Sequence, residues 1–305
     1  YVRRIINLCL IYAIIGLSMN LTNGFAGQFS LGQAGFMAVG AYVVGVFTVP
    51  VDLRPNVFYA VPMNPMIADI QLPLWLALLF GGLLAALIAF LIGWPVLRLR
   101  GDYLAIATLG FSEIIRILIT NAQSWTNGAL GIKDIPALND VRYIFVATAI
   151  TFLFVTCLIN SSYGRAFKAI REDEIAAEAM GVGLFKHKCM AFMLSAFFAG
   201  IGGGLFATLL GTVDPKNFLF TLTYNFLLII VLGGMGSITG SMLGSIIVTG
   251  GLEYLRVFDE PLELFGMAIP LFRPGFRMVM FSVLLMACVL FWRKGIMGTN
   301  EFTWE

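Results

Sequence analysis

Residues able to do acid–base, nucleophilic or metal chemistry are few and scattered along this chain of 305 residues. His187 is the only histidine, and we expect it to face water because it stands between Lys186 and Lys188. The chain has no G-x-x-x-x-G-K-[ST] loop, whose amides and lysine hold ATP phosphates. The cysteines are far apart, in or beside apolar runs, which predicts packed free thiols rather than disulfides or a metal site: Cys9, Cys157, Cys189 and Cys288. We therefore predict no enzyme, no metal site and no cofactor within this chain.

Most of the polar chemistry lies in one loop, at about 161–187. Its centre, AIREDEIAAEAMGV, is rich in helix formers and predicts one short helix that stops at Gly181. Lys168 and Glu172 are spaced to support that helix, and an apolar face is formed by Phe167, Ile170 and Ala177. A connector lying on the membrane surface is one interpretation, although its carboxylates disfavour anionic headgroups. A groove on a partner protein suits mixed charge with small apolar anchors better.

A second polar group accompanies many glycines at membrane depth, around Gly24 to Gly40. Irregular backbone there must avoid lipid, so it is buried in protein or meets a wet cavity, where helix ends can face the charges of a substrate. A polar turn at the membrane surface is an equally good interpretation. With one carboxylate from a later span, the candidate pathway residues are Asn20, Asn23, Gln28, Ser30, Gln33 and Glu113.

Glu113 and Arg116 lie within or late in a predicted span and are i,i+3 neighbours. An ionisable group at that depth is a functional hypothesis by default. A mutually satisfied ion pair at a wet helix end explains both residues, and a role in gating is the alternative.

Glycines at four-residue spacing form two stripes, Gly200 with Gly204, and Gly236 with Gly240 and Gly244. A helix with such a stripe allows another backbone to approach closely. We predict tight helix packing, and sliding of smooth surfaces during alternating access is the alternative.

The composition places these residues in a membrane protein. Apolar residues make up 59% of the chain and charged residues 12%, against roughly half and a quarter in soluble domains. The net charge of +2 does not indicate nucleic-acid binding. Apolar stretches recur along the whole chain, so we predict a single transmembrane domain, 1–305.

The predicted fold is an all-α polytopic bundle of about nine transmembrane helices, with some broken or re-entrant segments. A span needs about 20 apolar residues, and the candidates lie near 5–22, 30–49, 73–97, 103–121, 142–160, 188–210, 221–235, 237–255 and 275–292. Clustering of basic residues places the 161–187 loop in the cytoplasm. Because the sequence starts with Tyr1 rather than Met, we also expect an upstream segment.

Four segments together resemble the LivM-like permeases of branched-chain amino acid ABC importers, over essentially the whole chain: NLTNGFAGQFSLGQAGFMAVGAY, RLRGDYLAIATLGFSEIIR, AIREDEIAAEAMGV and VLGGMGSITGSMLG. The resemblance implies that the 161–187 loop holds a coupling helix that sits in a groove of a separate ATPase subunit. The coupling residues it implies are Arg171, Glu172, Asp173, Glu174, Ala177, Glu178 and Gly181.

The resemblance also implies partners and a location. They are a homologous LivH-like permease subunit, two ABC ATPase subunits that bind and hydrolyse ATP, and a periplasmic amino-acid-binding protein at the outer loops, all at the bacterial plasma (inner) membrane. The expected cargo is leucine, isoleucine and valine, with urea or another small polar solute as the alternative. An ion-driven secondary transporter or channel would need several intramembrane carboxylates or a repeated polar filter, and only Glu113 fits.

Overall fold

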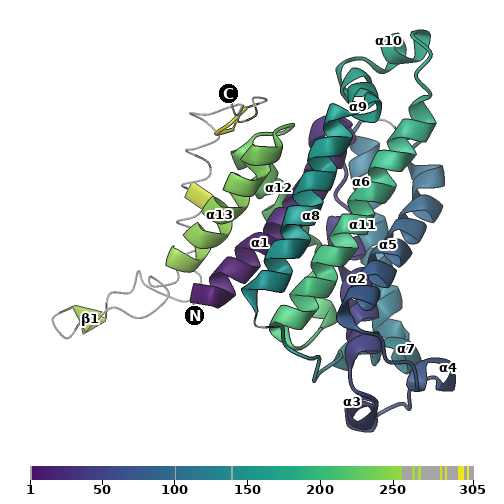
Figure 1. Cartoon of the computed structure of the whole chain (residues 1–305), viewed down its shortest axis with the longest axis vertical. Helices are drawn as coiled ribbons and strands as arrows, with labels where there is room; N and C mark the ends of the chain where they lie inside the picture. Colours follow the sequence, from purple (N-terminus) through teal and green to yellow (C-terminus); the bar gives the residue numbers. More distant parts are fainter. Residues whose placement is uncertain are drawn as a thin grey trace.

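The computed structural model describes residues 2–99, 101–138, 140–255, 263–264, 267–268, 282–283, 286, 295–298 and 301. Long helices form a bundle with two distinct ends (Figure 1). One end carries α9 (Ser162–Glu172) and α10 (Glu174–Ala179), and is called the α9–α10 end below. The opposite end, called the α3–α4 end, carries α3 (Arg54–Val57), α4 (Pro65–Ala68) and α7 (Gln123–Thr126).

The centre of the bundle is built from α1 (Val2–Asn20), α2 (Gln33–Thr48) and α11 (Leu184–Leu210), and one face of α5 (Leu74–Val96) packs against α2 and α11. Glycines let these backbones touch. A Cβ on Gly40 of α2 would lie only 1.9 Å from the carbonyl oxygen of Gly200 in α11. Gly204, one turn further along α11, leaves room for Val44 and Leu78 in the same way. The predicted packing role of Gly200 and Gly204 is confirmed.

The chain departs from regular α-helix after α1. The π-helix η1 (Leu21–Phe25) follows directly, and the Ala26 amide donates to the Leu21 carbonyl at 3.1 Å. An irregular stretch, 26–32, then leads into α2. Beyond α2 the chain bends by 98° into η2 (Val51–Leu53) and α3. The predicted broken segment is therefore present.

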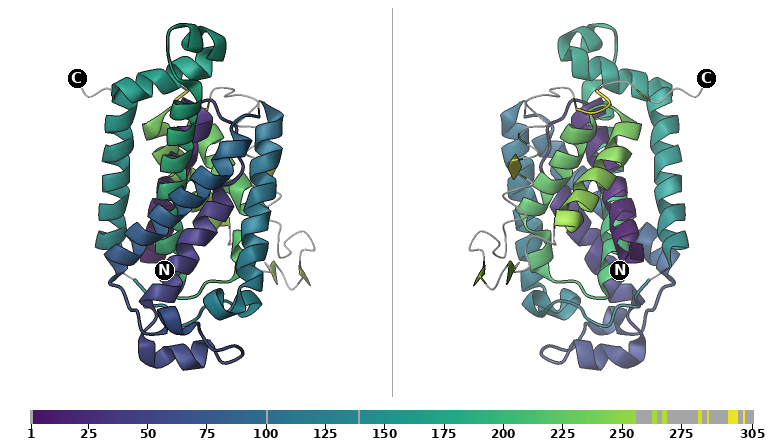
Figure 2. Two further views of the ribbon diagram at one scale, coloured as in Figure 1. Left: turned by 90° about the vertical axis from the view of Figure 1, so that its right-hand side faces the viewer. Right: turned by 90° about the vertical axis from the view of Figure 1, so that its left-hand side faces the viewer.

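Three helices form much of the outside of the bundle: α5, α6 (Asp102–Asn121) and α8 (Val141–Asn160). Each exposes large apolar side chains along its outer face. The two side views show α6 and α8 on opposite sides of the bundle (Figure 2). Outward apolar faces on helices of 20 residues or more fit a hydrocarbon environment.

A buried arginine organises the α3–α4 end. Arg54 donates to the carbonyls of Ile67 (2.8 Å), Ala68 (2.6 Å) and Ile70 (2.7 Å), and its Nε reaches Val49 at 3.2 Å. These acceptors include carbonyls at the C-terminal end of α4, which have no partner inside the helix. One side chain therefore fixes the loop that follows α2. Nearby elements are η3 (Gly128–Leu130) and η4 (Pro215–Phe218).

A helical hairpin, α12 (Phe220–Gly233) and α13 (Ile238–Tyr254), packs beside α1. A Cβ on Gly233 would meet the Gly240 carbonyl at 2.1 Å, and one on Gly244 would meet the Ile229 carbonyl at 2.3 Å. Gly240 and Gly244 thus allow close packing, as predicted. Gly236 was wrongly placed in that stripe, because it lies in the turn before α13 with φ +91°.

The remaining described elements are short. Two-residue strands β1 (Glu263–Leu264) and β2 (Met267–Ala268) pair antiparallel. The Glu301 carboxylate accepts hydrogen bonds from the amides of Ile238 and Thr239, at the start of α13.

Helices occupy eight of the nine ranges predicted as spans, and the ninth, 275–292, lies largely outside the described residues. In the described part, α1 with η1, α5, α6, α8 and α11 are long and apolar enough to cross a membrane. The bent α2–α3 segment would make a sixth, whereas α12 and α13 have only 14 and 17 residues. The chain is thus a helical membrane bundle, and the count of nine stays a prediction.

Candidate functional site

The predicted coupling loop forms two helices rather than one, and they project from the bundle (Figure 1). α9 begins after Ser161, whose hydroxyl accepts from the Tyr163 amide. Asp173 then interrupts the helix with an extended backbone, φ −154°. Its carboxylate accepts from the amides of Ile175 (2.8 Å) and Ala176 (3.0 Å). The single-helix prediction was wrong here because Asp173 caps the start of a new helix.

The end of α10 agrees with the prediction from Gly181. The Gly181 amide donates to the Glu178 carbonyl at 2.9 Å, and the Val182 amide donates to the Ala177 carbonyl at 3.0 Å. Gly181 has φ +83°, which a glycine adopts without strain. This pair of bonds closes a helix in the Schellman manner. Gly181 is therefore confirmed as the residue that stops the helix.

The apolar face predicted to meet a partner instead faces the bundle. Phe167, Ile170 and Ala177 are buried within this chain. The outward apolar side chains are Ile175 and Met180, which are 74% and 85% exposed. Sequence reasoning missed these two residues, although large apolar side chains amid the charges of such a short helix were a visible signal. We call this region the tip of α10: Ile175 lies in its first turn, Met180 follows its last residue, and Glu178 is exposed between them in the sequence.

Salt bridges hold the two helices in place. Glu174, the first residue of α10, pairs with Lys188 of α11 at 2.5 Å. Glu172 pairs with its neighbour Arg171, through Nη2 at 2.5 Å and Nε at 3.1 Å. Glu172 therefore pairs with Arg171, and not with Lys168 as its i,i+4 spacing had suggested.

Arg171 connects α9 to the broken helix after α1. Its Nη1 donates to the carbonyl of Gly24, within η1, at 3.0 Å. Two further glycines make room for it. A Cβ on Gly27 would lie 3.0 Å from the Arg171 Cα, and one on Gly236 would lie 2.8 Å from Nη1. Side chains at these positions would compete with Arg171 for space.

Asn20 continues this connection to the turn between α12 and α13. Its Oδ1 accepts from the Gly236 amide at 2.9 Å. Its Nδ2 donates to the Ser237 carbonyl (2.8 Å) and to the Ser241 hydroxyl (2.7 Å). A Cβ on Gly24 would lie 1.8 Å from the Asn20 Oδ1. Arg171 and Asn20 together therefore link α9, η1 and the α12–α13 turn, and we call this arrangement the Arg171–Asn20 junction.

Three more of the candidate pathway residues also hold the broken segment together. Asn23 exchanges hydrogen bonds with the backbone of Ser30, at 3.2 and 3.1 Å. Gln33, the first residue of α2, donates to the hydroxyls of Ser18 (2.9 Å) and Ser195 (2.8 Å). All five residues are buried. In this conformation these polar groups join α1, α2 and α11.

The other two candidate pathway residues differ from these. Gln28 is buried, and neither atom of its amide has a hydrogen-bond partner. Glu113 forms the predicted ion pair with Arg116 on α6, and the Nε–Oε1 distance is 2.9 Å. This pair lies on a different helix from the other candidates, so the six residues do not form one cluster.

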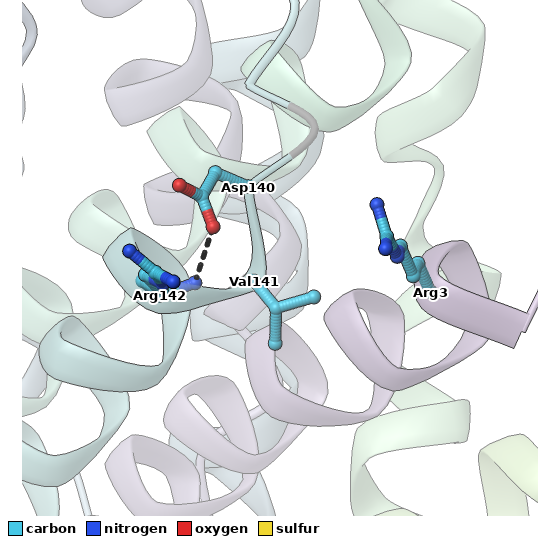
Figure 3. Close-up of a pocket in the computed structure, with 4 residues that line it drawn as sticks. All are labelled: Arg3, Asp140, Val141 and Arg142. Carbon is cyan, nitrogen blue, oxygen red and sulfur yellow. Dashed lines mark hydrogen bonds between the residues drawn. The ribbon is translucent and has the colours of Figure 1, made fainter.

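A charged cavity of about 610 Å³ lies between the start of α1 and the start of α8, away from the α9–α10 end. Figure 3 shows Arg3 on one side of it and Asp140, Val141 and Arg142 on the other. The Asp140 carboxylate caps α8 by accepting from the Arg142 amide at 3.1 Å. The cavity therefore presents cationic side chains from two helices.

Residues with catalytic or metal-binding chemistry remain isolated. His187 Nδ1 lies 2.8 Å from the Gly183 carbonyl, and its ring lies near Tyr163 and Phe167 while the residue stays partly exposed. Within the described ranges no three His, Cys, Asp or Glu residues are grouped to hold a metal. Cys9 and Cys189 are buried as predicted, Cys157 is exposed, and Cys288 lies outside the described residues.

Apolar spans, a broken helix in the core and two polar helices at one end define a multi-pass helical membrane protein. A family model described as "Branched-chain amino acid transport system / permease component" matches residues 1–289. The chain belongs to this family. No solved structure matches it.

Individual relatives agree with the family. The high-affinity branched-chain amino acid transport system permease protein LivM of Escherichia coli is 37% identical, over 84% of this chain and 64% of the relative. The corresponding LivH protein of Escherichia coli is 24% identical, over 78% of this chain and 79% of the relative. The guanosine ABC transporter permease protein NupQ of Bacillus subtilis is 24% identical, over 85% and 81%. The family and these relatives are transport permeases, not enzymes.

The chain spans 64% of the length of the LivM relatives from Escherichia coli and Salmonella typhimurium.

Proposed function

We propose that this chain is the membrane-spanning permease subunit of an ABC importer for branched-chain amino acids, in the bacterial inner membrane. The observation that carries the proposal is the Arg171–Asn20 junction. It joins two projecting polar helices to a broken helix in the core. Such a connection suits a subunit that receives force from a partner and changes the packing of its spans. Family membership and the names of the LivM and LivH relatives support the same function.

In this proposal α9 and α10 are the coupling helices, and residues 161–187 lie in the cytoplasm. The tip of α10 enters a groove on an ABC ATPase subunit through Ile175 and Met180, because exposed apolar side chains on a short helix suit such a groove. Glu178 meets the polar rim of that groove. Arg171 faces the opposite way, toward η1. ATP is bound and hydrolysed by two partner ATPases, and this chain holds no cofactor.

Inside the coupling region several predicted contact residues act on the helices themselves. Asp173 and Gly181 set the start and stop of α10. Glu174 ties α10 to Lys188, and Ala177 packs inward. These residues give α10 a defined orientation, so that a push on its tip is transmitted rather than absorbed by bending.

We propose two further partners, and the LivM and LivH names of the relatives support the first of them. A homologous LivH-like permease subunit completes the pathway, and a periplasmic amino-acid-binding protein delivers the substrate to the α3–α4 end. We further propose a single domain over 1–305 with about nine spans. Arg54 suits a receptor-facing surface, because its four hydrogen bonds keep that end rigid.

The cargo assignment rests on the names of the LivM and LivH relatives. NupQ, a guanosine transporter permease, matches a similar share of the chain at lower identity. Three candidate pathway residues, Asn23, Ser30 and Gln33, form hydrogen bonds with one another or with neighbouring hydroxyls. In this conformation these groups are not free to contact the side chain of a substrate. We therefore assign most of the selectivity to the binding protein.

Transport by the reconstituted complex tests the proposal. Vesicles containing this chain, its LivH-like partner and the ATPases, supplied with the binding protein, are expected to take up leucine only with ATP. Replacing Glu174 and Glu178 together should lower ATP hydrolysis, because it frees α10 from Lys188 and alters its outer face. Unchanged hydrolysis in that double variant, or leucine uptake by this chain alone under an ion gradient, would contradict the proposal.

A further inference from the structure

The ion pair of Glu113 with Arg116 lies within α6, away from the first turns of the helix. α6 has 20 residues, which span about 30 Å, the thickness of a hydrocarbon core. Glu113 is about 16 Å from the Asp102 end and about 12 Å from the Asn121 end, at 1.5 Å per residue. The carboxylate therefore lies near the middle of α6, within the predicted span, and Arg116 lies nearer the Asn121 end.

This pair is also open to the outside of the chain. The side chains of Glu113 and Arg116 are 32% and 22% exposed. Charged residues within spans face other protein or a water-filled cavity, because lipid cannot solvate them. By contrast, the outer face of α8 exposes apolar side chains such as Phe145, Ile150 and Leu153. The outer face of α6 also exposes apolar side chains such as Ile106 and Leu118, so the ion pair is what distinguishes it from the outer face of α8.

The same face of α6 also contains an exposed glycine with free space beside it. Gly110 precedes Glu113 by three residues, and a Cβ added there would meet nothing within 4 Å. Exposed residues continue along the face at helical spacing: Tyr103, Ile106, Gly110, Ile114 and Ile117. An open glycine beside polar groups at membrane depth suits close contact with another helix. α6 stands at the side of the bundle opposite α8 (Figure 2).

We propose that this face of α6, centred on Gly110, Glu113 and Arg116, is the surface that binds the second permease subunit of the transporter. The inference rests on the proposed function, which supplies a second membrane chain. A protein neighbour provides hydrogen bonds and close packing that lipid cannot, and the translocation pathway then runs beside α6. The outer face of α8 is left to lipid.

Disulfide crosslinking in the assembled transporter tests this surface. In a background without native cysteines, Gly110→Cys and Ile114→Cys are expected to crosslink to cysteines placed along the spans of the second permease subunit. Ile150→Cys, on the outer face of α8, is the matched control and should not crosslink. Crosslinks from the α6 positions to residues 275–292 of the same chain, or reaction only with a photoreactive lipid, would overturn the proposal.

A second measurement separates this inference from the proposed function. Glu113→Leu with Arg116→Leu should preserve the thermal stability of the isolated chain in detergent and cause loss of the second permease subunit on purification. Retention of that subunit by the double variant would overturn the α6 surface. Failure of the wild-type complex to take up leucine with ATP would instead overturn the proposed function, whatever the crosslinks show.

Discussion

Arg171 offers the sharpest test of the proposal that movement passes from the projecting helices into the core. Arg171→Gln removes the guanidinium that donates to the Gly24 carbonyl at 3.0 Å. A hydrogen bond with a charged partner contributes about 1.5–3 kcal/mol. Because each 1.4 kcal/mol is tenfold in an equilibrium, losing it weakens the coupling between α9 and η1 by about 10- to 150-fold.

The assay is leucine uptake and ATP hydrolysis measured together in vesicles that contain the whole complex. We expect Arg171→Gln to lower the leucine taken up per ATP by at least about tenfold, while hydrolysis continues because α10 still carries its outer surface. Glu172→Gln should have a smaller effect, since its carboxylate is largely exposed and such pairs contribute about 0–1 kcal/mol.

Arg98→Gln is the matched control for this series. Arg98 is exposed in the turn after α5, so the charge change is the same and η1 is untouched. Its uptake per ATP should equal that of the wild type. If Arg171→Gln also kept the wild-type ratio, the Arg171–Asn20 junction would not transmit the movement. A loss of hydrolysis in Arg171→Gln alone would assign Arg171 to ATPase docking instead.

Other regions of the chain give further predictions. Gly40→Ala should lower the melting temperature in detergent, because its Cβ would lie 1.9 Å from the Gly200 carbonyl and such overpacking costs about 1–3 kcal/mol. Gly250→Ala, which meets nothing within 4 Å, should not lower it. Arg54→Met should speed amide hydrogen exchange in the loop after α2, since each carbonyl left without a donor costs about 1–3 kcal/mol. Unchanged exchange there would show that the loop holds its shape without the arginine. Ile175→Glu should weaken co-purification of the ATPase subunits, because a carboxylate would then enter an apolar contact, and full recovery of the ATPases would argue against docking at this tip.

Several features of this protein could be predicted from local sequence, because local interactions specify them. Apolar runs about as long as a bilayer is thick located the long helices. The glycine at position 181 indicated where the helix ends, in a left-handed turn. The i,i+3 spacing predicted the ion pair of Glu113 with Arg116. The broken segment after α1 was visible in its glycines and amides. Each of these depends on residues a few positions apart.

The tertiary structure decided which distant residues meet and which side chains face outward. Arg171 meets Gly24 across 147 residues of chain, and Asn20 meets Gly236 across 216. Amphipathic spacing placed Ala177 on the apolar face predicted to meet a partner. In the structure α9 and α10 pack on the bundle, so that Ala177 is buried and Ile175 is exposed. In a membrane helix such as α5, apolar residues cover every side. Hydrophobic pattern therefore cannot distinguish a lipid-facing side from a buried one, and only the packing of distant helices does so.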